Sequence, residues 1–131
     1  LSLALLTPLL LVAGLAQSQP ADWEIDSEHF SIAFEAGHVG YQKQLGLFLE
    51  GSGSFHYDPD AQEFTAGRVE IQAGSIFTNL IARDNHLRGR DFLNTRRNPV
   101  IVFEATDYVP GNDAVPGILA GNLTLLGQTH P

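Results

Sequence analysis

Five stretches of this 131-residue chain alternate apolar and polar residues with a period of two. In the first, WEIDSEHFSIAFEAG at residues 23–37, Phe30, Ile32 and Phe34 fall on one face of the pleat, and the residues between them fall on the other. That period is typical of a half-buried β-strand. The other four stretches are residues 44–58, 64–77, 100–109 and 117–129. Several short antiparallel strands with one crossover indicate a barrel or a sandwich, and barrels of about eight strands hold one small ligand.

Residues 75–93, SIFTNLIARDNHLRGRDFL, break this alternation. Thr78 is placed to cap a helix, and a second helical turn is expected to start with Asp91 as its cap and to end before Pro99. Phe92 would then point inward. One face of the first helix is expected to carry Leu80, Ile81, Ala82 and Leu87.

The first 20 residues carry no charge, and the sequence contains no Met. An apolar run followed by small residues and a polar exit predicts a signal peptide over residues 1–18, with its charged n-region missing. A transmembrane helix is the alternative, but the run is short and Pro8 interrupts it. Residues 19–131 would form one barrel domain. The last predicted strand runs almost to Pro131 with nothing to cover its edge, which predicts a domain incomplete at its C-terminus.

Composition excludes several functions. The net charge is −8 at pH 7, and an acidic surface of this kind is expected to repel nucleic acid and anionic lipid headgroups. The chain contains no cysteine, which removes disulfides, thiolate catalysis and Cys-based zinc sites.

Candidate catalytic and metal-binding residues are weakly patterned. The five histidines show no ligand spacing such as HExxH, so no protein metal site is predicted. Asp84 and His86 resemble part of a catalytic pair, with Ser75 or Thr78 as a nucleophile, but no G-x-S-x-G elbow appears. Arg83 and Asp84 fit better as groups that fix the helix to the barrel end.

The apolar side of the strands is the remaining candidate site. A filled core and a ligand cavity give the same alternating pattern, so this pattern leaves both open. The residues expected to share the interior are Phe30, Ile32, Phe34, Phe48, Phe55, Val69, Ile71, Ile101, Phe103, Leu123 and Leu125.

From Trp23 to Pro131 the sequence resembles the YceI-like polyisoprenoid-binding proteins. The resemblance includes a glycine and aromatic pattern in the strands and the ending GNLTLLGQTHP. At Phe30 the chain departs from the family, which often has Ser there. The N-terminal pattern of the family is matched by Asp26 and His29. The most specific part of the resemblance lies in residues 75–93 and includes Thr78, Arg83, Asp84, His86 and Asp91.

The resemblance implies an eight-stranded, lipocalin-like antiparallel barrel, of which about five strands are expected in this chain. It implies an exported, periplasmic carrier that holds an isoprenoid chain, such as a polyprenyl lipid or the tail of a quinone, and that needs no other cofactor. Leu87 and Phe92 would close one end of the bore, and polar contacts of Arg83, Asp84 and His86 would hold that closure.

Two other functions stay open beside the carrier. One is an enzyme acting on an isoprenoid lipid, with His86 or His29 as acid–base groups. The other is a structural or stress-protective barrel with a filled core. For the carrier we expect an isoprenoid lipid as partner, no nucleic acid and no stable membrane insertion of the mature chain; a homodimer is left open.

Overall fold

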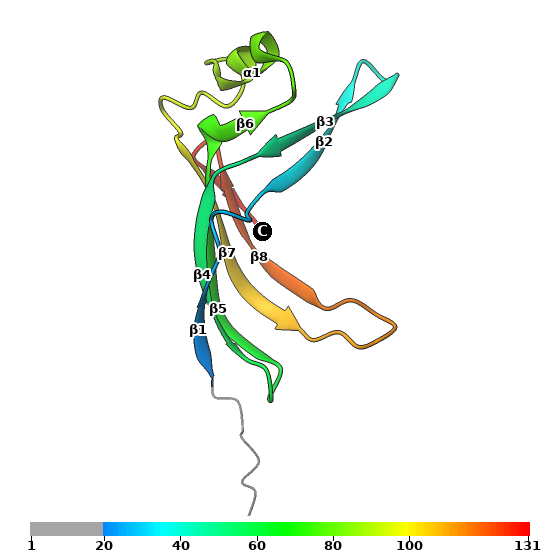
Figure 1. Cartoon of the computed structure of the whole chain (residues 1–131), viewed down its shortest axis with the longest axis vertical. Coiled ribbons are helices and arrows are strands. Elements are labelled where there is room, and N and C mark those ends of the chain that lie inside the picture. The colour runs from blue at the N-terminus through cyan, green and yellow to red at the C-terminus, as the bar shows by residue number, and fades with distance from the viewer. Residues whose placement is uncertain (1–19) are drawn as a thin grey trace, which may run out of the picture.

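A computed structural model describes residues 20–131, and the signal peptide predicted for residues 1–18 lies outside the described residues. Residues 20–131 form nine strand segments, one α-helix and one 3-10 turn, and their arrangement is seen in Figure 1. The elements are β1 Ala21–Glu24, β2 Ile32–His38, β3 Gln42–Phe48, β4 Gly51–Asp58, β5 Glu63–Gln72, η1 Ala73–Ser75, β6 Ile76–Phe77, α1 Ile81–Arg88, β7 Val100–Val109, β8 Ile118–Leu125 and β9 Gln128–His130.

The strands form two antiparallel sheets. The larger sheet has the order β1-β4-β5-β7-β8-β9, and the smaller has the order β2-β3-β6. The larger sheet is long and strongly curved, and α1 and β6 lie at one of its ends (Figure 1). The β2–β3 hairpin projects from that same end. Within residues 20–131 the two sheets do not join into a closed barrel, since neither β2 nor β9 has a second partner strand there.

The strand count differs from the expected five because four predicted strands are interrupted. The predicted strand over residues 44–58 divides at Leu49 and Glu50, and its halves β3 and β4 belong to different sheets. The predicted strand over 117–129 turns back at Leu126 and Gly127, whose positive φ angles of 55° and 73° suit a two-residue hairpin. The predicted strand over 23–37 divides into β1 and β2, which are separated by residues 25–31. The predicted strand over 64–77 is interrupted by η1, which separates β5 from β6.

The predicted helix is present but shorter and differently oriented than expected. It spans Ile81–Arg88, and the segment 89–98 contains turns rather than a second helical turn, so Asp91 caps nothing. The expected apolar helix face is also wrong in part, since Leu80 and Ile81 are 52% and 78% exposed. Leu87 does pack against the core.

The hydrophobic core lies where α1, β6 and the β2–β3 hairpin meet the large sheet. Its buried members are Phe48, Ile71, Ala73, Ile76 and Ile101. Partly buried side chains pack around this cluster, namely Phe30, Ile32, Phe34, Val69, Leu87 and Leu93. Burial of each large apolar side chain contributes about 1.5–3 kcal/mol, so this junction is the main source of tertiary stability in the described residues.

Several glycines in the strands lie beneath aromatic rings. A Cβ at Gly121 would overlap the ring of Phe103 and the carbonyl oxygen of Glu104, and a Cβ at Gly46 would overlap the ring of Phe34. Glycine in a strand weakens it unless something needs the space. Here the space lets each ring lie along the wall of the sheet instead of standing up into the interior.

We predict that Gly121→Ala lowers the free energy of unfolding by about 1–3 kcal/mol, because the new methyl group forces the Phe103 ring and the β7 backbone to move. Gly37→Ala is the matched control: it also changes a strand glycine, and no atom lies within 4 Å of its new Cβ. Urea unfolding of both variants checks this. Equal midpoints for the two would show that the close approach at Gly121 carries no cost.

Candidate functional site

The apolar face of the large sheet is the most extensive candidate site. The cross-strand register places Val69 opposite Phe103, and Phe103 opposite Leu123. Ile71 lies opposite Ile101 in the same ladder. The alternate residues on the other face are polar, for example Arg68 opposite Glu104, so the sheet has one apolar and one polar surface.

A row of aromatic side chains continues this face away from the core. Trp23 stacks on Phe55 with ring centroids 6.2 Å apart, and Phe55 stacks on Phe64 at the same distance. Tyr108 lies 5.9 Å from Phe64, and Tyr57 meets Tyr108 edge to face at 6.2 Å. Partial desolvation raises the pKa of the Tyr57 hydroxyl, so this end of the row carries no charge near neutral pH.

Sequence alternation missed Phe64 and Tyr108 because each lies beyond a β-bulge. The register between β4 and β5 shifts at His56/Tyr57, leaving Thr65 as an extra residue, and this turns Phe64 onto the apolar face. The register between β7 and β8 shifts between Ala105 and Asp107 in the same way, which turns Tyr108 onto that face. A single extra residue reverses every following side chain, and no strict period of two can show it.

The structure distributes the predicted interior residues over three environments. Phe48, Ile71 and Ile101 are buried in the core. The half-buried residues are Phe30, Ile32, Phe34, Phe55, Val69, Leu87 and Phe103. Leu123 and Leu125 are 41% and 37% exposed.

Phe92 does not take the inward position that the sequence predicts. It is 46% exposed and meets His86 edge to face, with ring centroids 4.8 Å apart. Its neighbour Leu93 packs against the core instead. The expected second turn of helix would have aimed Phe92 inward, and the turn that replaces it aims Leu93 there.

A buried polar cluster holds the crossover in place. The Asp84 side chain is only 4% exposed, and one of its oxygens accepts hydrogen bonds from the backbone N–H and the hydroxyl of Thr78. Arg83 donates to the hydroxyl of Thr78 at 2.7 Å and to its carbonyl oxygen at 2.6 Å. Thr78 is therefore not the helix N-cap, since that position belongs to Leu80 without a side-chain cap. Instead, the carboxylate of Asp84, in the first turn of α1, reaches back and satisfies Thr78.

Arg88 joins the other end of α1 to the strands. Its guanidinium donates to the carbonyl oxygens of Gly74 at 2.7 Å and of Ile76 at 2.8 Å. Because the bonds of Arg88 and of Asp84 join opposite ends of α1 to residues 74–78, the short helix is fixed at both ends. His86 is exposed and takes no part in these contacts beyond its meeting with Phe92.

We predict that Asp84→Ala lowers the free energy of unfolding by about 2 kcal/mol, because it leaves the buried Thr78 N–H and hydroxyl without their acceptor. Asp91→Ala serves as the matched control, since Asp91 lies exposed in the same crossover. Chemical denaturation gives both values. If Asp84→Ala proved as stable as Asp91→Ala, the buried cluster would not be what holds α1.

The predicted acid–base groups are not assembled into a catalytic arrangement. Asp84 contacts Thr78 rather than His86, and the Ser75 hydroxyl donates to the carbonyl oxygen of Gln72. Nowhere in residues 20–131 do three His, Asp or Glu side chains come together in a way that could hold a metal ion.

Two histidines make aspartate pairs near β1. His29 Nδ1 lies 2.7 Å from Asp26 in the turn after β1, and His56 Nδ1 lies 2.8 Å from Asp22 across the β1–β4 pair. The His29 side chain and the backbone N–H of Glu28 hold the pKa of Asp26 below its usual value. Both pairs are exposed, and the pair of His56 and Asp22 joins β4 to the edge strand β1.

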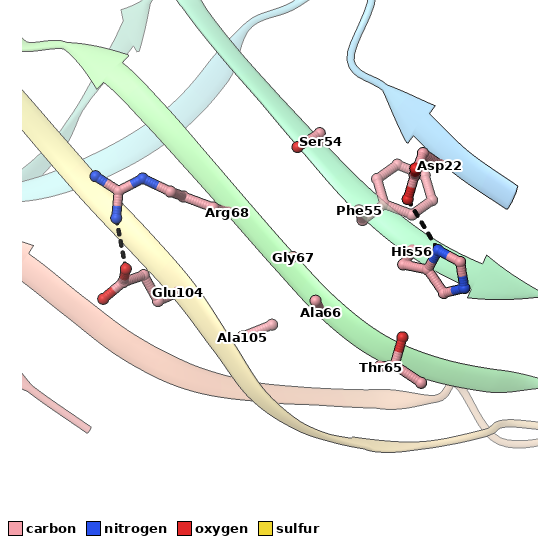
Figure 2. Close-up of a pocket in the computed structure, with 10 residues that line it drawn as sticks. All are labelled: Asp22, Ser54, Phe55, His56, Thr65, Ala66, Gly67, Arg68, Glu104 and Ala105. Carbon is pink, nitrogen blue, oxygen red and sulfur yellow. Dashed lines mark hydrogen bonds and ion pairs between the residues drawn. The ribbon is translucent and has the colours of Figure 1, made fainter.

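The polar face carries two shallow depressions of about 340 and 480 Å³. Figure 2 shows the first, with His56 turned toward Asp22 and Arg68 turned toward Glu104. Arg68 also donates to Glu70, and these two carboxylates raise the pKa of its guanidinium. Because its cation is already paired, this surface offers little to an anionic ligand, and the apolar face remains the better candidate.

The comparisons with known proteins agree with this geometry. The model of the YceI-like domain matches residues 23–131. The chain belongs to the YceI-like family. It is 40% identical over 124 residues to a UPF0312 protein of Pseudomonas aeruginosa and 39% identical over 125 residues to one of Yersinia pestis. Each alignment covers 93–94% of this chain and 63% of the relative, so the chain spans less than two thirds of the length of these curated relatives.

Solved structures share the fold. The YCEI protein of Campylobacter jejuni is 28% identical with a TM-score of 0.61, over 81% of this chain and 61% of that one. BcnA of Burkholderia cenocepacia has a TM-score of 0.63 at 17% identity, over 76% and 60% of the two chains, and supports the fold alone. The lipocalin-like, antiparallel β-barrel class predicted from the sequence is confirmed. None of these relatives carries the name of an enzyme.

Proposed function

We propose that this chain is the ligand-holding part of an exported carrier that binds an isoprenoid chain, such as a polyprenyl lipid or a quinone tail, along its apolar face. The single observation that supports this most is the continuity of that face. It runs from the core at Ile71 through Val69 and Phe103 to the stacked rings of Phe55 and Trp23. Its chemistry matches a branched hydrocarbon, which needs apolar contact and neither a metal nor a charge.

The partial exposure of this face favours a site over a filled core. Trp23 is 46% exposed and Leu123 is 41% exposed, whereas the α1 end is closed by buried side chains. The rings of Phe34 and Phe103 lie against Gly46 and Gly121, where a Cβ would otherwise stand. An elongated ligand would rest against these rings with one end directed toward the closed α1 end.

The energetics are adequate for such a ligand. Each buried methylene contributes about 0.8 kcal/mol, so ten buried carbons contribute roughly 8 kcal/mol before the cost of ordering the chain and losing its freedom. A polyprenyl tail crosses water poorly on its own, and an apolar face of this kind would shield it. We place the protein in the periplasm on the basis of the uncharged leader-like segment over residues 1–18.

Trp23, the only tryptophan in the chain, gives a direct measurement of binding. We predict that a polyprenyl quinone added to the purified protein quenches Trp23 fluorescence and that the quenching saturates, because the tail lies against the stacked Trp23–Phe55 pair.

Val69→Phe should weaken binding by about tenfold or more, since the larger ring occupies the apolar face opposite Phe103.

Val102→Phe is the matched control, because Val102 lies opposite Glu70 and Thr124 on the other face of the same sheet. It should leave the binding curve unchanged. Equal losses in the two variants, or no saturable quenching in either the variants or the parent, would contradict a ligand site on the apolar face.

A further inference from the structure

The charge of this acidic protein is unevenly distributed. Five of its seven basic residues lie between residues 83 and 97, together with only two acids, Asp84 and Asp91. Residues 83–97 of the crossover between β6 and β7 therefore have a net charge of +3. The rest of the chain, with two basic residues and thirteen acids, has a net charge of −11. The overall value of −8 conceals a basic end on an acidic body.

Three of the five arginines in the crossover are exposed and unengaged. Arg83 donates hydrogen bonds to Thr78, and Arg88 donates hydrogen bonds to Gly74 and Ile76, as described above. The side chains of Arg90, Arg96 and Arg97 are exposed and make no hydrogen bond or ion pair with any group in residues 20–131. They follow α1 in a segment that folds back onto the end of the helix, where the N–H of Asn94 donates to the carbonyl oxygen of Gly89 and that of Thr95 to the carbonyl oxygen of Arg88.

Exposed apolar side chains accompany these arginines. Leu80, Ile81 and Phe92 are 52%, 78% and 46% exposed. We call these three side chains, with Arg90, Arg96 and Arg97, the docking face. The turn of the β2–β3 hairpin lies at the same end of the molecule (Figure 1), and it carries Val39 and Tyr41, which are 73% and 94% exposed.

The opposite end of the molecule shows which partner this combination fits. The β4–β5 and β7–β8 turns lie there (Figure 1), and they also expose apolar side chains, such as Val115 at 58% and Ile118 at 63%. Their charges, however, are all acidic: Asp58, Asp60, Glu63, Asp107 and Asp113. Apolar exposure alone is thus common to both ends, and only the α1 end combines it with unpaired cations.

We propose that the α1 end docks on the surface of an anionic lipid bilayer. Arg90, Arg96 and Arg97 would meet the phosphates of the headgroups, and Ile81, Leu80 and Phe92 would enter the boundary between headgroups and acyl chains. Nucleic acid would offer the arginines phosphates but would leave Ile81 exposed to water. The acidic remainder of the chain would be repelled by the same surface, and this repulsion orients the molecule with its α1 end toward the membrane.

This docking differs from insertion. Among the described residues no helix is long and apolar enough to cross a bilayer. Docking of the α1 end also does not depend on what the apolar face binds. A failure of the carrier proposal and a failure of docking can therefore be observed separately. A net charge of −8 predicts repulsion from anionic lipid only if the charge is spread evenly over the surface. The charge is not spread evenly, because the α1 end is basic, and at this end we expect attraction.

The test is partition of the purified full chain onto vesicles of phosphatidylglycerol and of phosphatidylcholine, measured by co-sedimentation at low and at high salt. Residues 1–19 are identical in every variant, so a difference between a variant and its control on the same lipid reports on the docking face. We expect binding to favour phosphatidylglycerol and to weaken as salt rises.

Two variants with matched controls locate the contact. Arg97→Gln should reduce partition onto phosphatidylglycerol about fivefold, which corresponds to ~1 kcal/mol for one basic residue at an anionic surface. Gln62→Glu, in the β4–β5 turn, changes the net charge by the same amount and should have little effect. Ile81→Ser should reduce partition onto phosphatidylglycerol about tenfold, and Ile118→Ser at the opposite end should not.

The proposal is overturned if partition is equal for the two lipids, or if each docking-face variant matches its control. It is also overturned if the docking-face variants abolish self-association of the protein in sedimentation velocity while vesicle binding is absent. That last result would mean that the basic end meets the acidic body of a second copy.

Discussion

An antiparallel sheet with one apolar face has to cover that face, and within residues 20–131 the cover lies at one end. There α1, β6 and the β2–β3 hairpin meet the large sheet around Phe48, Ile71 and Ile101. The position of this cover depends on the buried contacts of Asp84 with Thr78 and of Arg88 with residues 74 and 76. Farther along the sheet the same face carries the partly exposed rings of Trp23 and Phe55. One closed end and one open, apolar length are the geometry that an elongated apolar ligand requires.

The class of fold could be predicted from the sequence because a half-buried sheet has a period that the residues must follow. Val69, Ile71, Ile101 and Phe103 lie on the apolar face as their alternation indicates. Phe64 could not be placed in this way, because the bulge opposite His56 and Tyr57 reverses its side chain. The aromatic row therefore became visible only when the register of the strands was known.

The crossover shows a second limit of local patterns. A threonine before a helix favours a capping role, but α1 begins three residues after Thr78, and the carboxylate of Asp84 supplies the contact from inside the helix. Which of two neighbouring residues points inward also depended on tertiary structure: a second helical turn would have buried Phe92, whereas the turn that forms buries Leu93. Net charge has the same limitation, since a total of −8 describes neither the acidic body nor the basic α1 end.

Whether the apolar face holds an isoprenoid chain is measured most directly by mass spectrometry of the solvent extract from the purified protein. We expect one isoprenoid lipid or quinone per protein molecule, whose mass gives the tail length. An extract without lipid, from protein that also takes up no added polyprenyl quinone, would contradict the account. The apolar face would then be covered by protein alone.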